Sequence, residues 1–198
     1  MADQESSLFT QLQAAAFREG LKPHTKKARE WFRKKARALG NVNKLDLIAD
    51  KRLTQLDRPA PGQMFLFTYD PKTKKELPYY DTFPLILMVD YTDTGFYGLN
   101  LHYLPPVPRA KLFDALLQTA NNKRFDDSTK LKINYQILKS TEKYSAFKPC
   151  FKQYLSGKVK SKIVRVDAPE WPIAMFLPTE SFRKASTQKV WADSRKMI

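Results

Sequence analysis

The sequence contains a single cysteine, Cys150, and only two histidines, His24 and His102, among 198 residues. One cysteine excludes an internal disulfide and a cysteine-rich zinc site, and it is usual for a protein made in a reducing compartment. The histidines are far apart and form no HxH or HxxxH pattern, so they make a poor metal site. We therefore expect no metal and no cofactor. Cys150 is expected to pack as a small apolar side chain rather than act as a thiol activated by nearby lysines, and His102 to be a hydrogen-bonded sheet residue.

Catalytic patterns are also missing. The six glycines are scattered and form no phosphate-binding loop, and no grouping of Ser, His and an acid suggests itself. Three acid pairs could be magnesium ligands of a nuclease: Asp90 with Asp93, Asp126 with Asp127, and Glu170 with Glu180. Glu142-Lys143, however, has no upstream Asp at the spacing of a D…ExK site. We expect a binding protein with no catalytic residues and no small-molecule substrate.

Long apolar runs are absent. The longest, residues 83–89, contains Pro84 and is far too short to cross a bilayer, which takes about 20 residues. The first residues, MADQESSLFTQL, lack the basic stretch and apolar stretch of a signal peptide. These features predict a soluble protein with no membrane partner.

Acidic residues are scarce relative to basic ones. There are 35 Lys and Arg against 20 Asp and Glu, giving a net charge of +15 and a pI near 9.8. Such an excess favours a polyanionic partner, first of all nucleic acid. An acidic protein partner comes second, and a charge that serves only solubility comes third.

The strongest helix prediction covers residues 23–39, because Pro23 suits a first turn and Gly40-Asn41 supplies a stop. From Lys22 to Arg37 the sequence has eight basic residues and one acid, Glu30. A helical wheel places the apolar residues together on one side, namely Ala28, Trp31, Phe32, Ala36 and Leu39. A basic stripe lies opposite, formed by Lys26, Arg29, Arg33 and Arg37 and widened by Lys27 and Lys34.

This basic stripe has three interpretations. A solvated helix face is the commonest explanation of such a pattern. Like charges four residues apart, as in Arg29/Arg33 and Arg33/Arg37, repel each other by a few tenths of a kcal/mol, which favours a face neutralised by an anion. A membrane-surface helix would also be basic and amphipathic, but the apolar side is small here, so this interpretation ranks third.

The densest aromatic and β-branched segment, residues 63–106, predicts the core. Apolar runs at about 63–69, 83–91 and 96–102 alternate with turn residues and predict an antiparallel meander. The first two runs are nearly continuous in apolarity, which predicts burial on both faces. Further elements are expected as helices over 7–19, 43–53 and 108–120, a strand over 130–136, a helical stretch from 141, a short helix over 149–157, a strand over 158–166, and a short helix over 179–184.

The predicted fold class is therefore α+β: a small antiparallel β-meander or partly closed barrel with flanking helices and a basic N-terminal helical arm. The Pro-rich connection at 56–62 is the best boundary. It divides the chain into a helical, basic arm over residues 1–58 and an α+β core domain with an extended C-terminal tail over residues 59–198.

Two further groups of residues have double interpretations. Lys158, Lys160 and Lys162 would share one face of the strand over 158–166, where they could bind DNA or protect an edge strand against pairing. The second group is aromatic and could stack on bases, although such residues more often pack in a core: Tyr79, Tyr80, Phe96, Tyr97 and Tyr103.

The runs LPYYDTFP at 77–84 and GFYGLNLHYLP at 95–105 resemble a family of proteins of T4-like tailed phages, the DNA end protectors. The resemblance extends from about Ala28 to the C-terminus and includes Lys148-Pro149-Cys150, Glu170-Trp171, Phe176-Leu177-Pro178 and Asp193-Ser194-Arg195. It implies a minor virion protein on the ends of the packaged genome that shields them from host exonuclease. It supplies no catalytic residues.

On this interpretation the partner is double-stranded DNA ends, with other virion proteins as further candidate partners, and the location is the virion and the host cytoplasm. The alternative is a structural protein of the head, neck, tail or baseplate held by protein contacts. The expected DNA-binding residues form two sets: Lys26, Lys27, Arg29, Arg33, Lys34 and Arg37, and then Lys158, Lys160, Lys162 and Arg165.

Overall fold

The computed structural model describes residues 7–22, 25–105, 108, 109, 114, 136, 139, 140 and 145–197. Most of the helix expected over 108–120, the strand over 130–136 and the first residues of the helical stretch from 141 lie outside these described residues. Within them, no helix combines the length and apolarity needed to cross a bilayer.

Six strands form one antiparallel sheet in the order β1-β7-β2-β4-β5-β6, which is not closed. Their bounds are β1 Thr54–Leu56, β2 Met64–Leu66, β4 Leu85–Thr92, β5 Gly95–Asn100, β6 Phe151–Leu155 and β7 Ile163–Val166. A separate two-stranded sheet pairs β3 (Tyr80–Asp81) with β8 (Phe182–Arg183). The α+β class is confirmed, and the three predicted strands correspond to β2, β4 and β5.

Both faces of the central strands are buried, as their apolar runs predict. Because side chains alternate across a strand, Met64 and Leu66 enter one core, and Phe65 enters another on the opposite face. The first core also contains α-helical residues. The second is aromatic-rich and comprises Phe65, Phe67, Ile86, Met88, Phe96, Tyr154 and Ile163.

Five α-helices are described: α1 Leu8–Arg18, α2 Lys26–Ala38, α3 Lys44–Ala49, α6 Trp171–Phe176 and α7 Thr187–Lys196. Side-chain oxygens cap the first three and the last, from Ser7, Thr25, Asn43 and Ser186. The helix predicted over 23–39 is confirmed as α2, capped by Thr25, while α3 is shorter than the 43–53 predicted.

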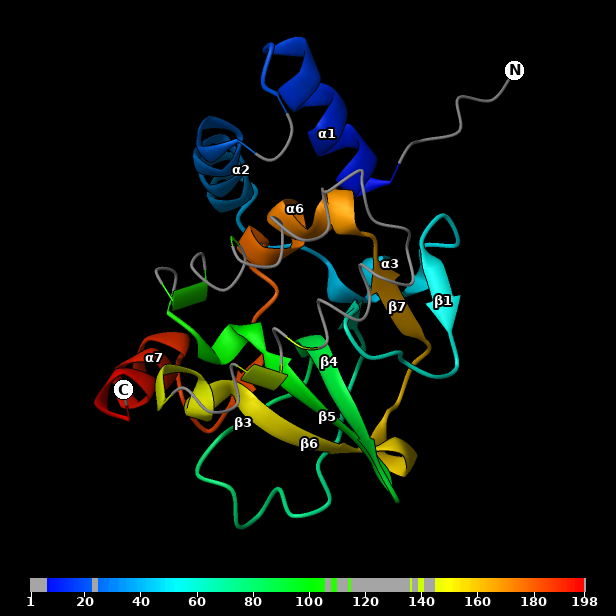
Figure 1. Cartoon of the computed structure of the whole chain (residues 1–198), viewed down its shortest axis with the longest axis vertical. Helices are drawn as coiled ribbons and strands as arrows, with labels where there is room; N and C mark the ends of the chain where they lie inside the picture. Colours follow the sequence, from blue (N-terminus) through cyan, green and yellow to red (C-terminus); the bar gives the residue numbers. More distant parts are fainter. Residues whose placement is uncertain are drawn as a thin grey trace.

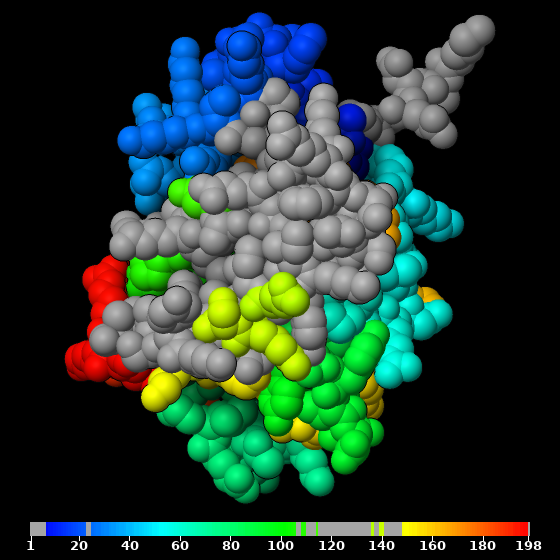
Figure 2. Space-filling view, viewed as in Figure 1, coloured from blue at the N-terminus to red at the C-terminus, as the bar shows by residue number. Residues whose placement is uncertain are grey.

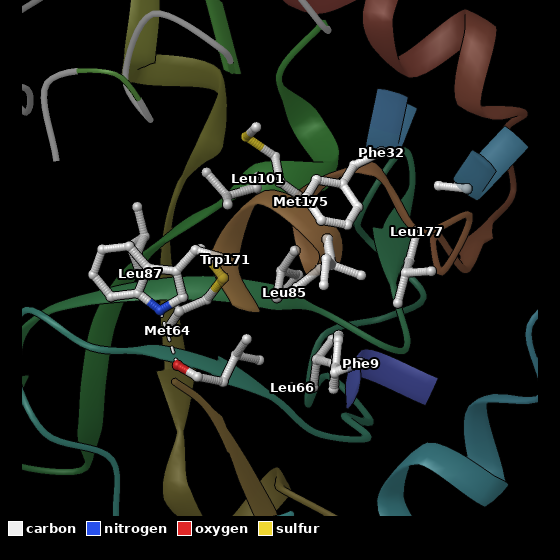
Figure 3. Close-up of a cluster of buried hydrophobic side chains, with 14 of the residues drawn as sticks. Phe9, Phe32, Met64, Leu66, Leu85, Leu87, Leu101, Trp171, Met175 and Leu177 are labelled. Atoms are coloured by element: carbon white, nitrogen blue, oxygen red, sulfur yellow. Dashed lines mark hydrogen bonds between the residues drawn. The ribbon is translucent and has the colours of Figure 1, made fainter. Parts of the chain in front are cut away.

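Helices α1, α2 and α6 contact one another and lie together toward one end of the molecule (Figure 1). Figure 3 shows Phe9 of α1, Phe32 of α2 and Met175 of α6 around the same cluster as the strand residues Met64 and Leu85. The first core therefore joins the N-terminal helices to the sheet, and β1, which lies before residue 58, is itself a strand of that sheet. The boundary at 58/59 stays a prediction.

Two helix predictions in the C-terminal half are wrong. The helix predicted over 149–157 is a 3-10 turn, Ser145–Cys150, followed by strand β6, because the exposed edge of β5 offers five residue partners to an extended segment. The helix over 179–184 is instead β8, which pairs with the two residues of β3.

The C-terminal tail is not extended, because residues 187–196 form α7 behind the Ser186 cap. Helix α6 was not predicted, and the segment that forms it contains Pro172 and follows Pro169. Both prolines lie at the first turn of a helix, where a missing backbone N–H costs nothing.

The β5–β6 pair depends on Gly95, since a Cβ there would collide with the backbone carbonyl of Tyr154. We expect Gly95→Ala to lower the free energy of unfolding by about 1–3 kcal/mol, the usual cost of overpacking, measured by urea denaturation. Gly157→Ala is the matched control, because a Cβ there meets nothing within 4 Å. Equal effects of the two substitutions would contradict this account of the strand pair.

Candidate nucleic-acid interface

The exposed face of α2 is almost entirely cationic. The helix carries seven basic residues and one acid, Glu30, while its opposite face buries Ala28, Phe32 and Ala36 against the core. Five of the six predicted cations of α2 are exposed: Lys26, Lys27, Arg33, Lys34 and Arg37. We call these five the α2 cations. Figure 2 shows the blue N-terminal region, which includes α2, with long side chains projecting at one corner of the molecule.

Arg29 differs from the other predicted cations of this helix. It is half-buried and forms an ion pair with Asp114. Because its charge already has a carboxylate partner within the protein, Arg29 has less to gain from an external phosphate than the α2 cations have.

Lys35 was not among the predicted site residues, yet it is exposed on the same helix. Its ammonium lies 5.3 Å from the centre of the Trp31 ring and 3.9 Å from Glu19 Oε1. Trp31 donates a hydrogen bond of 2.6 Å to the same carboxylate. Lys35 is thus held between an aromatic ring and an acid.

The second predicted set does not form a strand face. Lys158 ends a 3-10 turn, Lys160 and Lys162 lie in a connection, and only Arg165 belongs to β7. Acids lie close to these cations. Lys162 pairs with Asp57, and Arg165 donates a hydrogen bond of 2.9 Å to Asp167. The pKa of Asp70 is lowered mainly by its hydrogen bond with Lys74, and the charges of Lys158 and Lys160 lower it further. The edge on which they were expected is also paired, since β7 lies between β1 and β2.

The two predicted sets are not brought together. Figure 1 places α2 near one end of the long axis, whereas the turn between β6 and β7, which carries Lys158, lies toward the other end. Of the two, only the α2 cations form a continuous exposed group with few acids nearby.

A buried polar network was missed by the sequence reasoning. His102 Nδ1 lies 2.6 Å from Asp81 Oδ2, and His102 Nε2 lies 3.1 Å from Thr179 Oγ1. Asn100 Nδ2 donates to both Asp81 Oδ2 and the hydroxyl of Tyr154, at 3.1 Å each. These residues are separated by up to about a hundred positions in the chain, so no local spacing could have indicated the group.

The order of hydroxyl, imidazole and carboxylate in this network is that of a hydrolase triad. Thr179 and His102 are each only 1% exposed, however, and Asp81 is 4% exposed, so no substrate can reach the hydroxyl. Burial alone would raise the pKa of Asp81, but attraction to His102 and the hydrogen bonds it accepts hold that pKa below its ordinary value. The network is structural. His102 is hydrogen-bonded as expected, but it lies in the 3-10 turn Leu101–Tyr103 that follows β5 and not in the sheet.

Cys150 is buried, and burial raises the pKa of its thiol to about 12, so it packs as the small apolar residue expected. Among the described residues, no group of three or more His, Cys, Asp or Glu side chains is placed to hold a metal ion. Neither finding offers a centre for covalent or metal-assisted chemistry in this part of the chain.

Comparisons with known proteins give one result. The model of a family described as "Phage T4 terminal DNA protecting protein" matches residues 7–194. No curated protein and no solved structure gives a significant match.

Proposed function

Because the chain belongs to the family of phage T4 terminal DNA protecting proteins, we propose that it binds the double-stranded ends of the packaged genome and shields them from host exonuclease. The observation that carries this proposal is the exposed row of α2 cations. The activity is binding alone, without catalysis, and the protein acts in the virion and, after genome entry, in the host cytoplasm.

The α2 cations provide the affinity in this mechanism. Each cation that neutralises a phosphate releases condensed counterions, which favours binding at low salt. Such contacts hold the DNA without reading its sequence, as a protein must do if it is to act on ends of any sequence. The repulsion between neighbouring cations on the helix also falls when phosphates come between them.

The folded core provides the obstruction. The side of α2 opposite its cations is anchored through Phe32 to the core that contains the central strands, so a duplex held on α2 is held against the folded body of the protein. An exonuclease that must enclose or thread the terminus meets that body first. Protection by this route needs no reactive side chain.

We expect a gel shift to detect tighter binding to a linear duplex than to a closed circle of the same sequence. Affinity should also fall steeply with salt, with a slope of log affinity against log salt near −4.5 if all five α2 cations contact phosphates. The linear duplex should resist a processive exonuclease in the presence of the protein. Absence of binding to either DNA would favour the alternative, a structural protein of the head, neck, tail or baseplate.

A further inference from the structure

A pocket of about 390 Å³ opens between strand β6 and the loop that follows β2. In Figure 1 this loop, coloured teal to green, hangs below the yellow β6 at the end of the molecule opposite α2. Two kinds of side chain dominate its lining: the lysines Lys72 and Lys152, and the tyrosines Tyr69, Tyr79, Tyr80, Tyr103 and Tyr154. The pocket is near the lower end of the size range for small-molecule sites, so it can admit one nucleotide but not a duplex.

Lys152 is the unusual member of this lining. It is half-buried on β6, and its ammonium lies 4.3 Å from the centre of the Tyr103 ring. Among the described residues, no carboxylate lies within ion-pair distance of it. Withdrawing a cation from water without an anionic partner is costly, and partial burial correspondingly lowers the pKa of Lys152.

Asp81 is the one acid in the pocket lining, and its carboxylate already has hydrogen-bond partners outside the pocket. Its Oδ2 contacts His102 and Asn100, and its Oδ1 accepts from the backbone N–H groups of Phe83 and Ser181. The negative charge of Asp81 is therefore balanced within the buried network. The positive charges of Lys152 and Lys72 then make the pocket favourable for an anion.

The tyrosines complete a site for a base as well as a phosphate. Tyr79 and Tyr80 are half-exposed, and Tyr79 packs at 36° to Tyr103 with ring centres 6.0 Å apart. Aromatic faces bind bases of any sequence by stacking, and an adjacent cation binds the phosphate of the same nucleotide. The pocket thus offers an aromatic face and a cation within a volume that fits one nucleotide.

We propose that this pocket receives the terminal nucleotide of a DNA strand, with its terminal phosphate on Lys152 and its base against the tyrosines. The inference rests on the proposed function, since it names the part of the DNA that distinguishes an end from continuous duplex. Because α2 and the pocket lie toward opposite ends of the molecule, contacts with the duplex backbone and with the terminal nucleotide can be lost separately.

The test uses a stem-loop duplex with one open end that carries a 5′-phosphate, a 3′-phosphate or hydroxyls only. Fluorescence anisotropy should show that the wild-type protein binds one of the phosphorylated ends about tenfold more tightly than the hydroxyl end, as a charge-assisted contact provides. Lys152→Met should abolish that difference. Lys51→Met, which removes an exposed charge outside both sites, should preserve it.

Equal wild-type affinity for all three ends, or discrimination that survives in Lys152→Met, would overturn the inference. The wild-type comparison decides even if the variant does not fold. Free deoxyadenosine monophosphate serves as a second probe: binding as tight as that of the phosphorylated DNA end would identify a free-nucleotide site and overturn the assignment to DNA. Failure of the proposed function has a different signature, namely no preference for linear over circular duplex.

Discussion

Replacing Arg33, Lys34 and Arg37 together by Glu should reduce affinity for a linear duplex at least about a hundredfold at moderate salt. All three side chains are exposed on α2, and among the described residues none has a carboxylate within ion-pair distance. The triple substitution removes three phosphate contacts and adds three repulsive charges. The slope of log affinity against log salt should become shallower by about 3, which titrations at several salt concentrations would measure.

Arg29 is left unchanged in this variant because of its ion pair with Asp114. Reversing its charge would set two carboxylates against each other and confuse a loss of stability with a loss of binding. Thermal melting should show that the triple variant keeps the wild-type fold, since its three positions face solvent.

The control for total charge is the triple substitution of Lys44, Lys51 and Lys196 by Glu, which changes the net charge equally but places two of the changes on and just after α3 and the third on α7. This control should lose far less affinity, because the lost charges do not share one face. An equal loss in both variants would mean that net charge alone drives binding, and no loss in the α2 variant would remove α2 from the interface.

The sequence predicts those elements whose signal is local. The runs at 63–69, 83–91 and 96–102 are apolar because their strands are buried on both faces, and the resulting β2, β4 and β5 match them. Helix α2 is equally readable, because its apolar and basic residues repeat at the helical period. Leu39 is the exception, since it caps the helix and is 40% exposed instead of joining the core.

Elements that form only by pairing with segments far away in the sequence could not be predicted from local patterns. Strand β6 has a mixed sequence, FKQYL, that becomes a strand because β5 leaves an edge to pair with. The two residues of β8 are extended only because β3 lies beside them. Lysine patterns are misleading for the same reason: the predicted face of Lys158, Lys160 and Lys162 lies largely outside any strand.

The candidate site likewise has one part that local sequence predicts and one part that it does not. The α2 cations follow from the composition of one helix, whereas nothing local places Lys152 in a pocket, because the other side of that pocket is a loop some 80 residues earlier in the chain. Tyr79, Tyr80 and Tyr103 were recognised as possible stacking residues, but their convergence with Lys152 on one pocket required the folded arrangement. Conversely, the lysines that the sequence grouped at 158–162 are accompanied by acids such as Asp57 and Asp70.

The largest expected effect on stability is that of Asp81→Ala, which should lower the free energy of unfolding by about 3–5 kcal/mol and the Tm by roughly 10 °C. The substitution leaves the imidazole of His102 and the backbone N–H groups of Phe83 and Ser181 without their acceptor in a buried site. Glu76→Ala is the control, because Glu76 is an exposed acid in the loop after β2. Urea denaturation at neutral pH should detect almost no change in that variant.

The same residue predicts how stability responds to acid. The folded-state pKa of Asp81 lies below its unfolded value, so its contribution is complete above the unfolded pKa and is lost as pH falls through the lower, folded pKa. Wild-type protein should therefore lose more stability than Asp81→Ala as pH falls below about 5. Parallel pH dependence in the two proteins would show that the carboxyl is not held ionised by His102, and the variant's loss at neutral pH would then reflect the cavity alone.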